Sequence, residues 1–159
     1  MTAPTLLQTY RKFERLPFGN WLFSRVVCLK APYFGSIRPT ITRLEPGRCE
    51  ATIADRRRVH NHIGTVHAIA LCNLAELCAG VMTDASLPSG MRWIPKGMTV
   101  RYLKKATGRM HAVATPTIPL EARGAGYDVP VLVEVRDPDG DTVFDAEITM
   151  WLSPRATRG

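Results

Sequence analysis

A long apolar segment in the middle of the chain is the feature that most constrains the fold. Residues 60–82 begin with a polar, turn-like stretch and continue as a helical pattern that is apolar on every side. Alanine, cysteine and methionine fill most of its surface, and one face carries Leu71, Leu74, Leu77 and Val81. A helix that is apolar all round is a buried helix. The rest of the chain must therefore surround this segment.

Two polar side chains, Asn73 and Glu76, interrupt the apolar helix. A buried carboxylate without partners is costly, so Glu76 needs a specific hydrogen-bonding environment or a wet cleft beside it. Two interpretations remain open. In the first, Glu76 lies on a solvated edge of the helix or serves as a structural cap for another segment. In the second, it is a carboxylate kept for acid/base chemistry.

The residues before the helix predict an anion-stabilising helix start. Asn61, Gly64 and Thr65 form a loop that leads to a helix N-terminus near Val66 or His67. Unpaired backbone N–H groups and the helix dipole favour developing negative charge there, as in an oxyanion site. Glu76 lies about 12 Å further along the axis than Ala68. If both act on one carbonyl, they must come from different subunits of a two-fold dimer.

Length and composition predict one domain. The 159 residues are 45% hydrophobic, which suffices for a sizeable core. We expect no apolar run long enough to cross a bilayer, and the first residues lack a secretory signal, so a cytoplasmic protein without membrane contact is predicted. The four cysteines lack the spacing of a zinc site or a disulfide framework, and no metal site is expected.

The basic charge narrows the class of partner. A net charge of +7 suits an anionic ligand. The basic clusters are short and lack interleaved aromatic residues, which argues against nucleic acid. A phosphorylated small molecule is the better expectation, although Arg56 to Arg58 could equally be a solubilising surface.

The flanking sequence predicts helices first and strands afterwards. Helices are expected over residues 5–14 and 20–30, the second capped by Asn20 and carrying a stripe of Trp21, Leu22, Arg25 and Leu29. Alternating patterns predict six strands, at residues 37–44, 48–55, 91–105, 109–117, 129–135 and 144–152. The expected fold is α+β, an antiparallel sheet of about six strands wrapped around one long buried helix, with short N-terminal helices.

This combination resembles the hotdog-fold thioesterases, in particular the branch that hydrolyses phenylacetyl-CoA and other small aryl- or acyl-CoA thioesters. The branch pattern stands here as Asn61-His62-Ile63-Gly64-Thr65-Val66-His67-Ala68-Ile69, followed by Leu74-Ala75-Glu76. A second similar stretch is residues 100–108, VRYLKKATG. The chain looks most like an uncharacterised subgroup with a helical N-terminal extension. The resemblance implies one hotdog domain over 1–159, with the extension at 1–35 and the core at 36–153.

The resemblance also implies roles for individual residues. The Ala68 N–H would polarise the thioester carbonyl, Asn61 would position the thioester or the attacking water, and Glu76 of the partner subunit would act as general base or nucleophile. Substrate and coenzyme A would contact Gly64, Thr65, His67, Arg101, Tyr102, Lys104 and Lys105, with Arg101, Lys104 and Lys105 at the phosphates. Coenzyme A enters as part of the acyl-CoA substrate and no cofactor is implied. The expected assembly is a homodimer or a dimer of dimers.

Three departures from the family pattern keep alternatives open. Ala68 and Ile69 stand where the branch has two glycines, Glu76 stands where it has Asp, and the strand hydroxyl of some relatives falls at Pro95. A branched Ile69 narrows the space beside the helix start. An acyl-CoA thioesterase is the favoured function. A non-catalytic acyl-CoA or fatty-acyl binding protein is the first alternative, and a hotdog enoyl hydratase or dehydratase using His62, His67 and Glu76 is the second.

Overall fold

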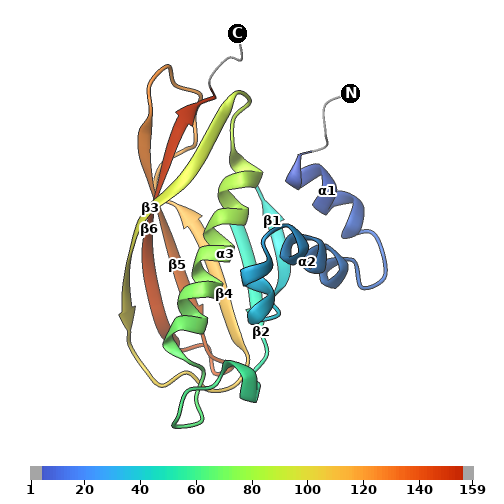
Figure 1. The fold of residues 1–159 in the computed structure, drawn as a ribbon, viewed down its shortest axis with the longest axis vertical. Coiled ribbons are helices and arrows are strands. Elements are labelled where there is room, and N and C mark those ends of the chain that lie inside the picture. Colours follow the sequence, from blue (N-terminus) through green and yellow to red (C-terminus); the bar gives the residue numbers. More distant parts are fainter. Residues whose placement is uncertain (1–4, 156–159) are drawn as a thin grey trace.

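A six-stranded antiparallel sheet curls around one long helix in the computed structural model, which describes residues 5–155 (Figure 1). The strand order is β1-β2-β4-β5-β6-β3. The strands are β1 Thr40–Glu45, β2 Arg48–Ile53, β3 Met91–Tyr102, β4 Met110–Pro116, β5 Tyr127–Arg136 and β6 Thr142–Pro154. The helices are α1 Leu6–Phe13, α2 Gly19–Lys30 and α3 Ala68–Ser86, with short 3₁₀ segments η1 Pro32–Ser36 and η2 Arg57–Val59. The predicted α+β hotdog arrangement is confirmed.

The helix α3 forms the centre of the core, as its all-round apolar surface predicts. Leu74, Leu77 and Met82 are fully buried against the inner face of the sheet. By length and composition α3 would also suffice to cross a bilayer, so the expectation that no segment is long enough was wrong. Here 61% of its apolar window is buried within the protein, as in the core helix of a globular domain. The curved sheet therefore covers the apolar surface of α3, as lipid would cover that of a membrane-spanning helix.

The two N-terminal helices lie beside β1 and extend the core. Tyr10 of α1 packs edge-to-face on Phe23 of α2, with ring centroids 5.1 Å apart. Ser24 docks α2 on the sheet, because its hydroxyl accepts a hydrogen bond from the Ile41 N–H of β1 at 2.8 Å. The face of α2 around Phe23 and Ser24 is thereby turned inward. The helical extension thus belongs to the packed body of the protein.

The expected cap of α2 was wrong. The helix begins at Gly19 after Phe18, which has a left-handed backbone (φ 58°), and Asn20 instead donates from Nδ2 to the Thr42 carbonyl at 3.1 Å. The stripe of Trp21, Leu22, Arg25 and Leu29 faces outward, with Trp21 52% and Leu29 82% exposed. The docking of the opposite face on β1 decides the orientation, and helical spacing alone could not reveal it.

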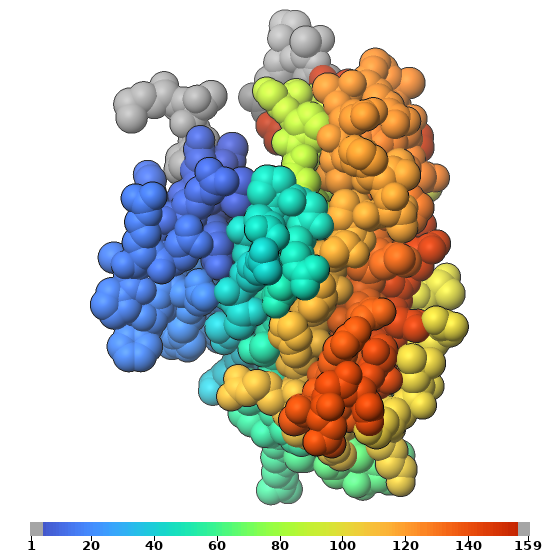
Figure 2. Space-filling view, turned by 180° about the vertical axis from the view of Figure 1, so that it is seen from behind, coloured from blue at the N-terminus to red at the C-terminus, as the bar shows by residue number. Residues whose placement is uncertain are grey.

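The strand β3 closes one edge of the sheet and pairs only with β6 within residues 5–155. From behind, the sheet runs from the teal β1–β2 hairpin through the orange strands to the yellow β3 (Figure 2). A register shift between Pro95 and Gly97 bends the strand. Ile94, Met98 and Tyr102 are exposed along it. The molecule therefore presents a long, partly apolar open edge.

Candidate functional site

The first turn of α3 offers one backbone donor that has no acceptor. His67 caps the helix, and its Nδ1 accepts a hydrogen bond from the Ile69 N–H at 3.0 Å. The neutral ring therefore carries its hydrogen on Nε2. Within residues 5–155, no hydrogen bond is donated by the Ala68 amide. This amide lies at the positive end of the helix dipole and is available to a carbonyl oxygen.

The loop before the helix is held by Asn61. Its Oδ1 accepts from the N–H groups of Ile63 and Thr65, both at 3.1 Å, and its Nδ2 donates to the Thr65 hydroxyl at 2.8 Å. Gly64 takes a left-handed backbone at φ 79°, which a side chain would strain. The sequence prediction that these three residues form the helix entry is confirmed. The bonds of Asn61 give it a positioning role for the loop, and its contact with substrate stays a prediction.

A cavity of about 330 Å³ lies beside this helix start. Residues from η1, η2 and α3 line it, including Tyr33, Ser36, Arg58, His67 and Ile69. Asn73 is its most buried polar member, with 6% of the residue exposed. The amide donates from Nδ2 to the Ser36 hydroxyl at 3.2 Å, while Oδ1 is buried without a partner. Sequence reasoning did not rank Asn73 as a site residue, although an amide in an apolar helix was the available signal.

Glu76 lies two turns further along α3 and is exposed. Its carboxylate accepts no hydrogen bond and forms no ion pair within the described part of the chain. The residue borders an apolar pocket of about 200 Å³ between α1, α2, α3 and β3, whose walls include Leu6, Val27, Phe34, Leu77, Gly80 and Trp93. Within one subunit the structure therefore separates Glu76 from the helix start.

Tyr102 lies near the first turns of α3. Its hydroxyl is 3.3 Å from the sulfur of Cys72, which is one helical turn beyond Ala68. The hydrogen bond with Cys72, followed by partial burial, raises the pKa of Tyr102 above its ordinary value. The structure thus brings this predicted binding residue close to the predicted oxyanion donor.

Two of the three residues expected at the phosphates are already paired with acids. Arg101 forms a two-pronged ion pair with Asp145 at 2.6 and 2.8 Å. Lys104 contacts Asp137 at 2.9 Å and Asp141, and these bonds raise the pKa of Lys104 and lower that of Asp137. Register explains the first pair, since Arg101 lies opposite Asp145 across β3 and β6. This neutralisation disfavours the phosphate role predicted for Arg101 and Lys104.

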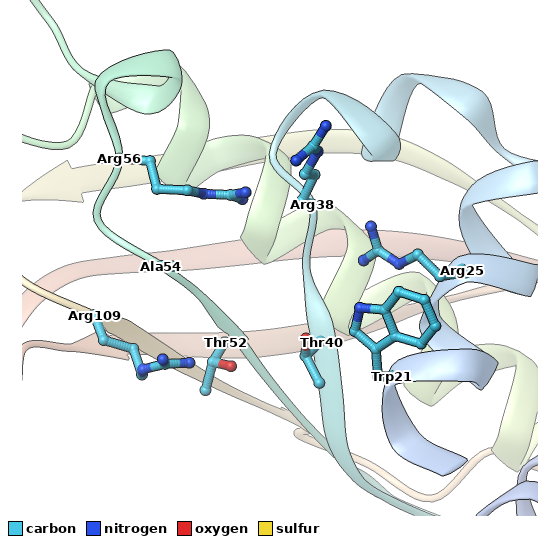
Figure 3. A pocket seen from close by; sticks show the side chains of 8 residues that line it. All are labelled: Trp21, Arg25, Arg38, Thr40, Thr52, Ala54, Arg56 and Arg109. Atoms are coloured by element: carbon cyan, nitrogen blue, oxygen red, sulfur yellow. The ribbon is translucent and has the colours of Figure 1, made fainter. Parts of the chain in front are cut away.

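A different basic cluster lines the largest cavity described, of about 500 Å³ (Figure 3). Four arginines come from four separate segments and share it with two threonines, an alanine and an indole: Trp21, Arg25, Arg38, Thr40, Thr52, Ala54, Arg56 and Arg109. Sequence reasoning missed the cluster because only the run from Arg56 was visible as a charge group. The described residues contain no group of histidine, cysteine and carboxylate side chains that could hold a metal ion.

Comparison with solved structures places this geometry among hotdog proteins. A structural-genomics crystal structure, APC5556, is 48% identical, with a TM-score of 0.81 over 94% of this chain and 99% of that chain. A Pseudomonas aeruginosa protein of unknown function, named as a probable thioesterase, is 25% identical, with a TM-score of 0.70 over 88% and 97% of the two chains. A thioesterase from Haemophilus influenzae shares the fold at 17% identity, with a TM-score of 0.70 over 81% and 87%.

Comparison of sequences gives the family. No curated protein matches this chain at a significant level. The family described as Domain of unknown function (DUF4442) matches residues 19–152, which includes α2, the whole sheet except its last residues, and α3. The resemblance to an uncharacterised subgroup of hotdog thioesterase-like proteins is thereby confirmed. The chain belongs to the DUF4442 family and has the hotdog fold of thioesterases.

Proposed function

We propose that the protein is an acyl-CoA thioesterase that hydrolyses a small aryl- or short- to medium-chain acyl-CoA. The observation that carries the proposal is the Ala68 amide at the start of α3, which has no acceptor within residues 5–155 and lies beside a cavity with a buried polar group. Solved neighbours with this fold include named thioesterases, which supports hydrolysis as the type of reaction.

In the proposed reaction the thioester carbonyl oxygen accepts a hydrogen bond from the Ala68 N–H. A water molecule attacks the carbonyl carbon, and the negative charge that develops on the oxygen is stabilised by this amide and by the helix dipole. Glu76 of the partner subunit takes the proton of the water as general base. The C–S bond then breaks, and the proton passes to the sulfur, so that the products are a carboxylic acid and free coenzyme A.

A shared site is proposed because the two groups are too far apart in one chain. Ala68 and Glu76 are separated by about 12 Å along the axis of α3. Ile69 and Glu76 of α3 are exposed, and Cys72 between them is half-buried. The edge strand β3 lies close to this part of α3, because the Cys72 sulfur is 3.3 Å from the Tyr102 hydroxyl and Glu76 shares a pocket with Trp93. Two copies that pair through these surfaces about a two-fold axis would run their α3 helices antiparallel. Glu76 of one copy would then lie near Ala68 of the other.

The apolar pocket beside Glu76 supports a small acyl group. Its volume of about 200 Å³ and its mostly apolar lining suit a short aliphatic or aryl group and exclude a polar one. Trp93 forms one wall and is fixed by a hydrogen bond from Nε1 to Asp84 at 2.7 Å. The acyl group would enter here while its carbonyl meets the partner's helix start.

A non-catalytic acyl-CoA binding protein is the second candidate. It is favoured by Ile69, whose branched side chain is 55% exposed and lines the cavity where the branch has glycine. Such a side chain reduces the room for a tetrahedral intermediate beside the Ala68 amide.

The experiment offers purified protein a panel of aryl-, short- and medium-chain acyl-CoA esters and measures free thiol. We expect turnover, and a loss of at least about 100-fold in kcat for Glu76→Gln. Asp139→Asn is the control, since it also removes an exposed carboxylate but lies in the turn before β6, away from α3 and from the pocket beside Glu76. Tight binding without thiol release would favour the binding protein. Full activity of Glu76→Gln would eliminate Glu76 as the base.

A further inference from the structure

The cavity of four arginines concentrates positive charge that no acid within residues 5–155 pairs with. We call the set Arg25, Arg38, Arg56 and Arg109 the arginine cavity. They come from α2, from the turn before β1, from the segment after β2 and from the turn before β4. Figure 3 shows Arg25 and Arg56 extending toward one another from opposite sides, with Arg38 between them. No carboxylate is among the lining residues.

The nearby acids are engaged elsewhere. Asp55 precedes Arg56 in the chain, but its carboxylate contacts the His60 ring and accepts the Gly108 N–H at 2.6 Å. Glu50, on the strand that supplies Thr52, pairs with Arg48 and His111. None of the four arginines has an ion pair anywhere in residues 5–155.

The guanidinium groups are anchored in place although they repel one another. Arg25 donates from one terminal nitrogen to the Pro39 carbonyl, and Arg56 donates likewise to the Ile37 carbonyl at 3.2 Å. The Nε atoms of both are buried and have no hydrogen-bond partner among the residues that the structure describes. Burial, followed by the charges of Arg38 and Arg25, lowers the pKa of Arg56. Buried donors without acceptors destabilise a fold, and a ligand with acceptor oxygens in this cavity would reduce that cost.

The backbone of Arg38 adds to this arrangement. Its φ of 46° lies in the left-handed region, which is unfavourable for residues other than glycine, asparagine and aspartate. This conformation is part of the turn that leads into β1 and places the third guanidinium at the cavity. The strained backbone and the unpartnered donors therefore occur at the same place.

We propose that the arginine cavity binds the phosphate groups of a phosphorylated small molecule. Guanidinium forks match phosphate oxygens in two-pronged hydrogen bonds, and several of them around one cavity suit a dianion or a diphosphate. The hydroxyls of Thr40 and Thr52 provide further donors. The exposed ring of Trp21, with the Arg25 guanidinium 6.0 Å from its centre, offers a flat surface at the rim. A volume of about 500 Å³ is that of a small-molecule site.

The position of the cavity indicates two sources of such a phosphate. Ile37 and Arg58 line the cavity at the start of α3, while Arg38 and Arg56 line the arginine cavity, so that two neighbouring stretches of chain form walls of both. The first source is the phosphate-bearing end of the acyl-CoA, an assignment that rests on the proposed function. The second is a separate phosphorylated molecule.

Calorimetric titration of the full chain with coenzyme A and with pyrophosphate tests the proposal without requiring turnover. Arg109→Gln and Arg38→Gln are the main variants, because neither side chain makes a hydrogen bond within the described residues that folding would lose. Arg136→Gln, on the outer face of β5 and paired with Glu134, is the matched control. We expect each cavity variant to weaken binding by about tenfold or more, with the control unchanged and Kd rising with salt.

The outcomes separate the sources from each other and from the proposed hydrolysis. Weaker binding of both probes supports the acyl-CoA source, and dephospho-coenzyme A then tells whether the 3′-phosphate or the diphosphate is held. Weaker binding of pyrophosphate alone supports a separate phosphorylated ligand. Unchanged binding of both probes in folded variants, or no binding to the wild type, overturns the site. Cleavage of an N-acetylcysteamine thioester, which lacks phosphate, reports on the proposed hydrolysis independently.

Discussion

Asn73 of α3 donates from its amide nitrogen to the hydroxyl of Ser36 at 3.2 Å, while its amide oxygen is buried without a donor. A buried acceptor that lacks a donor costs about 1–3 kcal/mol. Asn73 lines the cavity beside the start of α3, where a substrate N–H or a water could supply the missing hydrogen. An unsatisfied atom at this place is a feature of a binding site more than of a core.

The substitution Asn73→Leu separates stability from function. Leucine has a similar shape and removes the unsatisfied oxygen, so we expect the melting temperature to stay equal or to rise. Thioester hydrolysis should fall by about tenfold or more if the oxygen contacts substrate or water. Ser36→Ala is the control, because it removes the same hydrogen bond and leaves the oxygen in place. A fully active Asn73→Leu enzyme would assign the residue to packing alone.

The substitution Ala68→Pro deletes the proposed oxyanion donor with little change to the fold. Proline is well tolerated at the first position of a helix, and the preceding His67 already has the extended backbone (φ −65°, ψ 138°) that proline requires. We expect circular dichroism and melting to stay close to the wild type, and kcat to fall by about 100- to 1,000-fold. Ala68→Ser, which keeps the N–H, is the control. Undiminished turnover in a folded Ala68→Pro protein would refute the oxyanion role.

Mixing inactive subunits tests whether each site is shared. An Ala68→Pro subunit and a Glu76→Gln subunit are each expected to be inactive as homodimers. In a mixed dimer one site carries both substitutions and the other carries none. Random exchange makes about half of the dimers mixed, so about a quarter of wild-type activity should return. Recovery that stays at zero while mixed dimers form would place both groups in the same chain.

A charge on the open edge of the sheet should prevent self-association. Ile94 on β3 is 58% exposed, and Leu132 on the outer face of β5 is 45% exposed. Ile94→Lys adds a charge to the edge strand and is expected to shift the protein to monomers in analytical ultracentrifugation. Leu132→Lys, a comparable change away from the edge, should leave the dimer intact. Dimers that persist in Ile94→Lys would move the interface to another surface.

Asp55 should stabilise the helix entry in a pH-dependent way. Its carboxylate contacts the ring of His60 and accepts the Gly108 N–H, and these bonds lower the pKa of Asp55. A lowered pKa in the folded state means that the stabilisation is complete above the unfolded value of about 3.9 and is lost as pH falls through the folded value. Asp55→Asn should therefore unfold at lower urea than wild type at pH 7, and the difference should shrink below pH of about 4. Asp139→Asn, in the exposed turn before β6, should show no such convergence.

The elements of this fold could be predicted because their signals are local. Val129, Val131, Val133 and Val135 alternate as a half-buried strand must, and β5 contains all of them. The position of α3 at the centre of the core could be predicted in the same way from its apolar surface. The start of β1 could not be placed as well, because the left-handed backbone of Arg38 delays the strand to Thr40.

The relations between distant elements were not readable from the sequence. The face that α2 buries depends on the hydrogen bond between Ser24 and Ile41, residues 17 positions apart. The pairing of Arg101 with Asp145 follows from the register of β3 and β6. The arginine cavity needs four segments to be folded before any two of its charges meet. The loop around Asn61 and the helix start that follows it could be predicted, because they depend on neighbouring residues. The arginine cavity and the cavity beside the start of α3 depend on tertiary structure.

The order of elements along the chain also bears on synthesis. Four of the six strands that enclose α3, from Met91 to Pro154, follow it in the sequence. At ribosomal speeds their translation takes roughly 3 to 13 s. During that interval α3, which is apolar enough to cross a bilayer, has been synthesised but the strands that cover it have not. Contacts between residues so far apart in the sequence form slowly. Expression yield should therefore depend more on chaperones and growth temperature than the stability of the finished protein would suggest.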